Sequence, residues 1–221
     1  MGPDGAPFQS CSRARAILRR VSDRRPVLLV HGIWDRGAHL ARMRAELEQR
    51  GLGPVRAIDL VPNDGRAPIL ELARQVGEHA RELAERAGAE RVDVVGFSMG
   101  ALVTRAYVQR LDGKQRVRRF VSISGPHRGT ATAYALPFAG CRDMRPGSAF
   151  LRGLEADRDP WGEVEVHVLY TPYDLMILPA ASSRLPGARS EHVLPVALHR
   201  WMIHDARALE RVARILRGEE R

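Results

Sequence analysis

The chain has 221 residues, enough for one domain with a buried core, and its 44% hydrophobic and 28% charged residues are ordinary for a globular protein. No apolar run approaches the ~18 residues that a membrane-spanning helix needs. The net charge of +9 reflects 35 basic and 26 acidic residues. Almost all of the basic residues are arginines that lie beside acidic partners along the chain, and no recognition motif accompanies them. A nucleic-acid partner is therefore not expected.

We expect an N-terminal lead at 1–22 and a single domain at 23–221. The lead has no apolar run followed by a cleavage site, so no signal peptide is visible. This favours the cytoplasm, or secretion if the sequence has been trimmed from a longer precursor. Cys11 and Cys141 could pair only in an oxidising compartment, and we expect two free thiols.

After the lead, short apolar runs alternate with amphipathic stretches. Strands are expected at 26–30, 55–61, 91–97, 117–124, 164–170 and 192–198. Helices are expected near 37–51, 68–88, 99–111 and 205–217, the last with Asp205 as its N-cap, and a longer irregular segment at 125–160. This alternation predicts an α/β fold with a single, mostly parallel sheet of about six strands flanked by helices.

The sharpest motif is Gly96-Phe97-Ser98-Met99-Gly100, a G-x-S-x-G sequence that follows an apolar strand and opens a helix. In such a strand–turn–helix setting the serine sits in a strained turn, and its hydroxyl projects above the sheet. Glycines two residues before and after it let the strand and helix approach without Cβ clashes. The motif predicts Ser98 as a nucleophile.

A serine hydroxyl needs a base, and in this topology the expected chain order is serine, acid, histidine. Late in the chain, His192, His199 and His204 are candidates. His192 is predicted at the starting end of the last strand, the wrong edge of the sheet. His199 follows the carboxyl end of that strand directly, so we favour it over His204, which fits a structural or rim position.

The acid should follow the preceding strand. Asp174 fits, because Tyr170 ends a strand and Pro172 turns the chain, although an aspartate also favours turns for its own sake. The donors for a developing oxyanion are expected at the amides of Met99, next after the nucleophile, and Ile33, in the sharp turn after the first strand. His31 is expected to brace that turn.

Four segments resemble the α/β-hydrolase superfamily, and specifically the small bacterial triacylglycerol lipases and carboxylesterases with little or no lid. They are residues 30–33, 94–101, 124–130 and 173–177, and the similarity covers roughly 26–216. The resemblance implies the same roles for Ile33, Met99, Asp174 and His199. Its Pro-His-Arg-Gly-Thr segment, 126–130, is interpreted as a structural turn beside the pocket. Arg200 departs from the family, whose members usually have a small apolar residue there, and predicts a more polar pocket mouth.

Substrate contacts are expected from Trp34, Leu175 and Met176, although the last two could simply be buried core. Tyr134, Leu136, Pro137 and Phe138 form either a short lid or packing under a loop within 131–160. These ambiguities leave lipase and short-chain esterase open.

The residues together predict a carboxylic ester hydrolase that acts through an acyl-enzyme on a small ester or lipid, with neither a cofactor nor a metal. Thioesterase and acyltransferase activities share the machinery. The rivals from other classes are a catalytically silent member of the fold that only binds, and a basic protein that binds RNA or a surface.

Overall fold

The structure, a computed structural model, describes residues 25–220, so the predicted lead and Cys11 lie outside it. Six strands form one sheet in the order β2-β1-β3-β4-β5-β6, and every pair is parallel. The strands are β1 (Val27–Val30), β2 (Val55–Ile58), β3 (Val92–Phe97), β4 (Val117–Ile123), β5 (Glu165–Tyr170) and β6 (Ser190–Val193). The predicted parallel sheet is confirmed.

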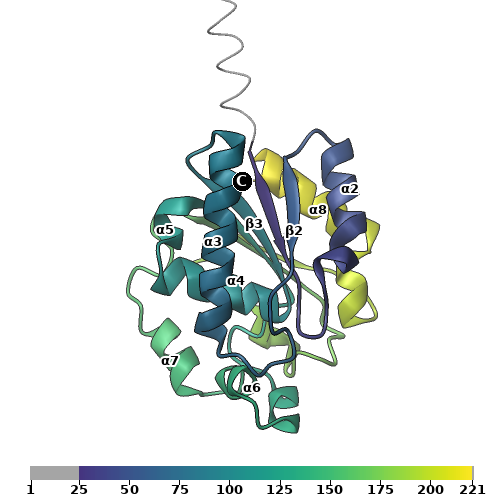
Figure 1. Cartoon of the computed structure of the whole chain (residues 1–221). Helices are drawn as coiled ribbons and strands as arrows, with labels where there is room; N and C mark the ends of the chain where they lie inside the picture. Colours follow the sequence, from purple (N-terminus) through teal and green to yellow (C-terminus); the bar gives the residue numbers. More distant parts are fainter. Residues whose placement is uncertain (1–24, 221) are drawn as a thin grey trace, which may run out of the picture.

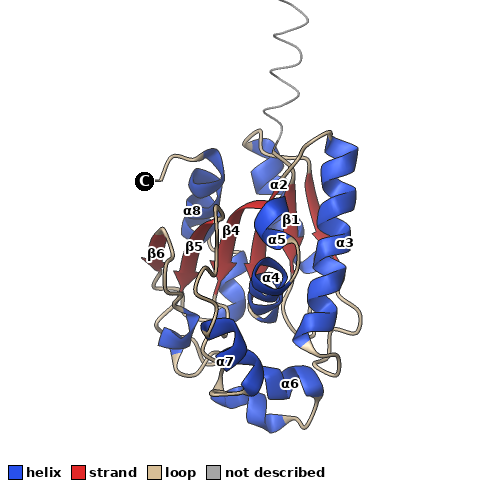
Figure 2. Cartoon of the chain, turned by 90° about the vertical axis from the view of Figure 1, so that its left-hand side faces the viewer, coloured by secondary structure: helices blue, strands red, loops and turns tan. Residues whose placement is uncertain are grey.

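Helices cover both faces of the sheet (Figures 1 and 2). The helices α3 (Ile69–Ala87), α4 (Met99–Arg110) and α5 (Gly113–Arg116) lie on one face, and α2 (Ala41–Gln49) and α8 (Ala206–Arg217) on the other. The short helices α6 (Ala139–Asp143) and α7 (Ala149–Glu155) lie toward the end of the sheet that is lowest in Figure 1. Four 3-10 turns, η1 (Gly37–Leu40), η2 (Ala131–Ala135), η3 (Ala180–Ser183) and η4 (His199–Ile203), complete the connections.

Alternate residues of β1 to β5 enter two separate cores, as the period of two in a strand requires. On β1, Leu28 and Val30 pack toward α3 and α4, whereas Val27 and Leu29 pack toward α2 and α8. Both sets are fully buried, which explains why this strand is apolar throughout rather than alternating. Within residues 25–220 there is no helix with the length and apolar character to cross a membrane.

The structure corrects three sequence predictions. The last strand is Ser190–Val193 rather than 192–198, because Pro195 has no N–H for the ladder. The second strand stops at Ile58 rather than at residue 61, because the N–H groups of Leu60 and Val61 donate to the side chains of His31 and Gln75. The segment 125–160, predicted as irregular, contains η2, α6 and α7. These helices are too short for a period of 3.6 to be visible in the sequence.

The strand order changes direction at β1, the second strand from one edge of the sheet. From β1 the chain passes to β2 on one side, and it then crosses back to β3 on the other side of β1. Ligands of open parallel sheets bind at such a switch point, outside the carboxyl ends of the strands. The loop after β1 and the turn after β3 therefore meet at one place on that edge.

Candidate active site

Ser98 occupies the tight turn between β3 and α4. Its backbone has φ 54° and ψ −125°, a strained conformation for a residue with a side chain. The turn is held because the Ser98 N–H donates to the carbonyl of Ile123 at 2.9 Å. A Cβ at Gly96 would lie 2.7 Å from the Ala101 Cα, and one at Gly100 would lie 2.3 Å from the His31 carbonyl oxygen. Only glycine fits at either position.

The loop after β1 packs directly against this turn. A Cβ on Gly32 would meet the Ser98 Cβ at 2.9 Å, so the loop reaches the serine because residue 32 has no side chain. His31 is fully buried; its Nδ1 lies 2.7 Å from the Gly32 carbonyl, and its Nε2 accepts from the Leu60 N–H at 2.9 Å. Burial lowers the His31 pKa and keeps the ring neutral. The prediction that His31 braces this loop is confirmed.

Asp174 and His199 are in direct contact. Nδ1 of His199 lies 2.7 Å from Oδ2 of Asp174, whose side chain is fully buried. Since a carboxylate accepts, Nδ1 carries the proton and Nε2 is left as the basic nitrogen. The other carboxylate oxygen, Oδ1, accepts from the N–H groups of Met176 and Ile177 at 2.9 and 2.8 Å. The aspartate thus forms the turn that its residue type favours and orients the imidazole as well.

His199 and Ser98 line the same pocket, of about 220 Å³, and the His199 ring lies 4.8 Å from that of Phe97, the residue before the serine. The structure therefore brings together Ser98, Asp174 and His199, from the ends of β3, β5 and the turn η4. His204 ends η4 and does not line this pocket.

The prediction that His192 lies at the starting end of the last strand is wrong, because His192 lies near the carboxyl end of β6. Its Nε2 instead faces the Glu220 carboxylate at 2.7 Å, so this histidine is occupied elsewhere.

The N–H groups of Ile33 and Met99 are the predicted oxyanion donors. Both residues line a pocket with Ser98. Within residues 25–220, neither N–H donates to another protein atom. Met99 is also the first residue of α4, where the partial positive charge of the helix N-terminus favours an anion.

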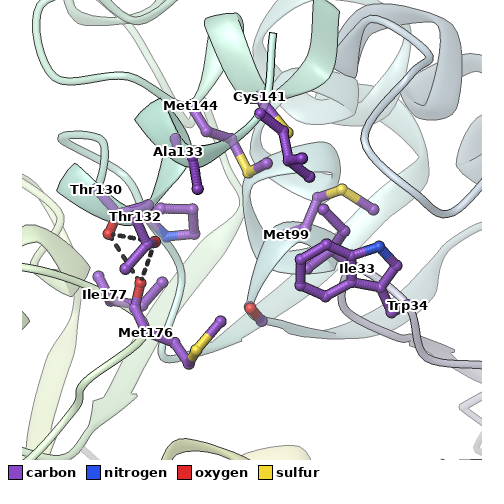
Figure 3. A pocket seen from close by; sticks show the side chains of 14 residues that line it. Ile33, Trp34, Met99, Thr130, Thr132, Ala133, Cys141, Met144, Met176 and Ile177 are labelled. Carbon is purple, nitrogen blue, oxygen red and sulfur yellow. Dashed lines mark hydrogen bonds between the residues drawn. The ribbon is translucent and has the colours of Figure 1, made fainter. Parts of the chain in front are cut away.

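An apolar cavity of about 280 Å³ has Ser98, but not His199, among the residues that line it. Figure 3 shows the side chains around this cavity. Trp34 and Met176 lie near its mouth, and Ala133, Cys141 and Met144 lie at the opposite end. Of the predicted substrate contacts, Trp34 and Met176 line it, whereas Leu175 does not and is 70% exposed. Instead Ile177, two residues on, contributes to the wall. The thiol of Cys141 is free and buried, and burial raises its pKa.

The segment 131–160 supplies the far wall of this cavity. Ala133, Ala135 and Leu136 line it, whereas Tyr134 is 60% exposed. Leu136 belongs to the stretch predicted as a short lid or as packing under a loop, and it packs against the core. Ala133 and Ala135 were not predicted as contacts, because the placement of η2 depends on tertiary packing. Thr130 connects this segment to the loop that follows Asp174. Its hydroxyl donates to the Met176 carbonyl at 2.8 Å and accepts from the Leu178 N–H at 2.9 Å.

A polar cluster that sequence reasoning missed joins the two sides of the pocket mouth. Asp35, next to Trp34, lies 2.7 Å from a guanidinium nitrogen of Arg200, which follows His199. The same carboxylate oxygen lies 2.9 Å from Nδ1 of His39. The Asp35 side chain is 9% exposed and that of Arg200 56%. The predicted polar mouth is present, with Arg200 bound to the loop after β1.

Comparisons with known proteins agree with this architecture. The family model for palmitoyl protein thioesterases matches residues 26–173. A triacylglycerol lipase from Pseudomonas fragi is 33% identical over 124 residues, which are 54% of this chain and 40% of the lipase. Palmitoyl-protein thioesterase 3 from Dictyostelium discoideum is 28% identical over 112 residues, 49% of this chain and 38% of the relative. The matched region thus spans about two fifths of each curated relative.

Two solved lipase structures share the fold. Mature lipase BlEst2 from Bacillus licheniformis has a TM-score of 0.73 at 14% identity, covering 97% of this chain and 96% of that one. Lipase B from Aspergillus fumigatus has a TM-score of 0.75 at 16% identity, covering 88% and 52%. The predicted α/β-hydrolase fold, and the resemblance to lipases and esterases, are confirmed.

Proposed function

We propose that this chain, which belongs to the palmitoyl protein thioesterase family, hydrolyses apolar acyl esters in two steps. The observation that carries the proposal is the convergence of the strained Ser98 with the hydrogen-bonded Asp174–His199 pair at the mouth of an apolar cavity. Each part would have little use for binding alone. Strain at a serine is costly, and it persists where geometry at that residue serves a function.

In the first step the Ser98 Oγ attacks the acyl carbonyl carbon while Nε2 of His199 takes the hydroxyl proton. Asp174 holds the ring in the tautomer that leaves Nε2 free and stabilises the imidazolium that forms. The carbonyl oxygen becomes an oxyanion, which the unoccupied N–H groups of Ile33 and Met99 bind. One such donor is worth about 2.7–4 kcal/mol in comparable sites.

Collapse of this intermediate breaks the bond to the leaving group, which takes the proton back from His199. The acyl group then remains on Ser98, and water repeats the sequence with His199 again as base. The reaction releases a carboxylic acid and returns the serine hydroxyl. Every proton moves through one imidazole, and the set needs no metal or organic cofactor.

The apolar cavity supports an acyl chain as the group held on the enzyme. Its walls are mostly apolar, from residues such as Met99, Leu136 and Met144. Each buried methylene contributes about 0.8 kcal/mol. A medium or long acyl chain is therefore preferred over an acetyl group, and a lipid or lipid-like ester over a small polar one.

An acyl thioester is the second candidate, and the family match favours it. The same serine, histidine and amides would act, because a thioester presents the same carbonyl and a thiolate leaves more readily than an alkoxide. The leaving group lies on the side of His199 and Arg200, outside the acyl cavity.

The first test measures hydrolysis of p-nitrophenyl esters of rising chain length by the native chain and by Ser98→Ala, His199→Ala and His204→Ala. We expect the first two variants to lose at least 10³-fold in kcat/KM. His204→Ala is the matched histidine control and should remain within a few-fold. Activity retained in Ser98→Ala, or lost only in His204→Ala, would refute the assignment.

The second test pairs each ester with the thioester of the same acyl group, with the released thiol measured by a colour reagent. A larger kcat/KM on thioesters than on the matching esters, lost in Ser98→Ala, would identify a thioesterase. A larger kcat/KM on the esters would identify an esterase. Tight binding of acyl compounds with no turnover of either would identify the silent binding protein instead.

A further inference from the structure

A second hollow, of about 330 Å³, shares no lining residue with the acyl cavity. It lies between α4, the end of α7 and the loop after η3, and α4 packs beside α7 (Figures 1 and 2). Small-molecule sites commonly measure about 300–1,000 Å³. We call this hollow the arginine pocket, because three arginines and several apolar side chains line it: Arg105, Arg128, Arg184, Leu154, Trp161 and Leu185.

Arg105 brings a buried charge to the arginine pocket. It belongs to α4 and is 4% exposed. Its Nε donates to the side-chain oxygen of Gln109 at 2.7 Å, and its Nη1 donates to the His127 carbonyl at 2.8 Å. Both acceptors are neutral, and no carboxylate within residues 25–220 forms an ion pair with this guanidinium. Burial lowers the pKa of Arg105 from 12.5 to about 10, so the side chain is still charged at neutral pH.

The guanidinium of Arg105 has donors left over where it meets the pocket. It carries five N–H groups, and its planar fork can bind two oxygens of a carboxylate or phosphate at once. Its Nη2 has no partner in the part of the chain that the structure describes, and it is not among the polar atoms sealed in the core. A buried charge with only neutral partners is costly. An anion in the pocket would supply the missing partner.

Two of the other charged side chains that line the pocket already have partners. Asp157 lies 3.4 Å from Nζ of Lys114, and Nε of Arg184 lies 2.9 Å from a carboxylate oxygen of Glu191. Asp157 therefore contributes little free negative charge to Arg105, and Arg184 little free positive charge to a ligand.

The remaining charged groups leave the pocket with a surplus of positive charge. Neither Arg128 nor Glu155 forms an ion pair with any residue of the described chain. Together with Arg105, the pocket thus has two unpaired guanidinium groups and one unpaired carboxylate. Arg110 adds positive charge nearby, since it contributes to the lowered pKa of Arg105. The surplus matches a ligand with one oxyanion.

We propose that the arginine pocket binds a small organic anion, whose oxygens are held by Arg105 and Arg128 and whose apolar part lies against Trp161 and Leu185. The indole of Trp161 is 6% exposed and is held in place, because its Nε1 donates to the Pro186 carbonyl at 3.0 Å. A carboxylate and a phosphate monoester present the same paired oxygens to a guanidinium. The ligand needs no acyl ester, so the site goes beyond the proposed function and does not depend on it.

Isothermal titration calorimetry with benzoate and phenyl phosphate tests the pocket, and the ratio of the two Kd values identifies the preferred oxyanion. Benzamide is the matched neutral probe, because it has the shape of benzoate without the charge. We expect saturable binding of at least one anion at one site per chain, and at least tenfold weaker binding of benzamide than of benzoate.

Single-charge variants locate the site. Arg128→Gln should raise the Kd at least fivefold, and Glu155→Gln should lower it at least threefold, because it removes the unpaired carboxylate. Arg74→Gln is the control for net charge, since Arg74 is exposed on α3 and does not line the pocket, and it should change the Kd less than twofold. Arg105→Gln should abolish binding, but it also removes bonds within the core. The two surface variants therefore decide the test, and circular dichroism verifies their fold.

Arg200→Gln distinguishes this pocket from the catalytic mouth, where Arg200 is exposed. A higher Kd in this variant, with no effect of Arg128→Gln, would place the anion at the mouth and overturn the proposal. No saturable binding, equal weakening by Arg74→Gln, or an unchanged Kd in both Arg128→Gln and Glu155→Gln would overturn it as well. Anion binding without hydrolysis of any ester or thioester would keep the pocket and remove the proposed function, and hydrolysis without anion binding would do the reverse.

Discussion

Gly100→Ala tests the close approach on which the serine turn depends. The added Cβ would lie 2.3 Å from the His31 carbonyl oxygen and 2.6 Å from that of Val30. Both are backbone atoms at the end of β1, which is hydrogen-bonded to a strand on each side and cannot withdraw. The N-terminus of α4 must therefore move away by roughly 1 Å, since real Cβ contacts stay beyond 3.0 Å.

Two opposing terms set the expected magnitude. Alanine in place of a helical glycine stabilises by at most about 1 kcal/mol, whereas overpacking of this kind costs about 1–3 kcal/mol and sometimes more. The net expectation is a loss of about 1–2 kcal/mol in unfolding free energy. Activity should fall much further, because a displacement of about 1 Å in reacting groups can cost about 10²-fold, and the Met99 amide moves with α4.

Urea denaturation and the kcat/KM on p-nitrophenyl butyrate measure the two effects. Gly153→Ala on α7 is the matched control, because its added Cβ would meet only the end of the Arg110 side chain, at 2.9 Å, which can move aside. That variant should keep its activity. If Gly100→Ala kept both its denaturation midpoint and its activity within twofold, the argument that contact with β1 sets the serine geometry would be refuted.

Three further expectations follow. Asp35→Asn removes the charge that holds Arg200, so kcat/KM should fall by about three- to tenfold. Because the pair is partly exposed, added salt should reduce the activity of the native chain toward that of the variant. Equal salt sensitivity of the native chain and the variant would contradict this role of the pair. Burial, with only partial relief from Glu165, lowers the His167 pKa to about 4 from 6.5. The unfolded chain therefore binds this proton first, and stability should fall as the pH drops from 6.5 toward 4, by up to about 3 kcal/mol, in urea titrations; His167→Gln should show a shallower decline. Ala133→Leu fills the far end of the cavity and should shorten the preferred acyl chain by about two to four carbons, with butyrate hydrolysis as the control that stays unchanged.

Local features of the sequence were enough to predict the elements that present Ser98. A buried parallel strand is apolar along its length, and glycines on both sides of residue 98 are needed because a Cβ there would clash with the backbone. The motif and the strand and helix around it could therefore be predicted together. Asp174 was also predictable, since its turn-forming role and its place after a strand coincide at one residue.

Other parts depend on contacts between distant segments, which no local pattern encodes. The pairing of Asp35 with Arg200 joins residues 165 positions apart in sequence. The cavity end formed by Ala133, Cys141 and Met144 depends on η2 packing against α6 and on α6 packing against α3. The strand β6 was misplaced because an apolar run through Pro195 looks like a strand, although a proline cannot join the ladder.

The two oxygens of the Asp174 carboxylate have different partners, which limits the residues that can replace this aspartate. An asparagine there has only one oxygen, which the two backbone N–H groups of Met176 and Ile177 would claim. Its amino group would then face Nδ1 of His199, which would have to give up its hydrogen and become an acceptor. The ring proton would pass to Nε2, the nitrogen that we propose accepts a proton from the serine. Nitrogen chemical shifts of the imidazole would reveal this exchange without any turnover, and an otherwise intact protein would hold a histidine with its reactive side already filled.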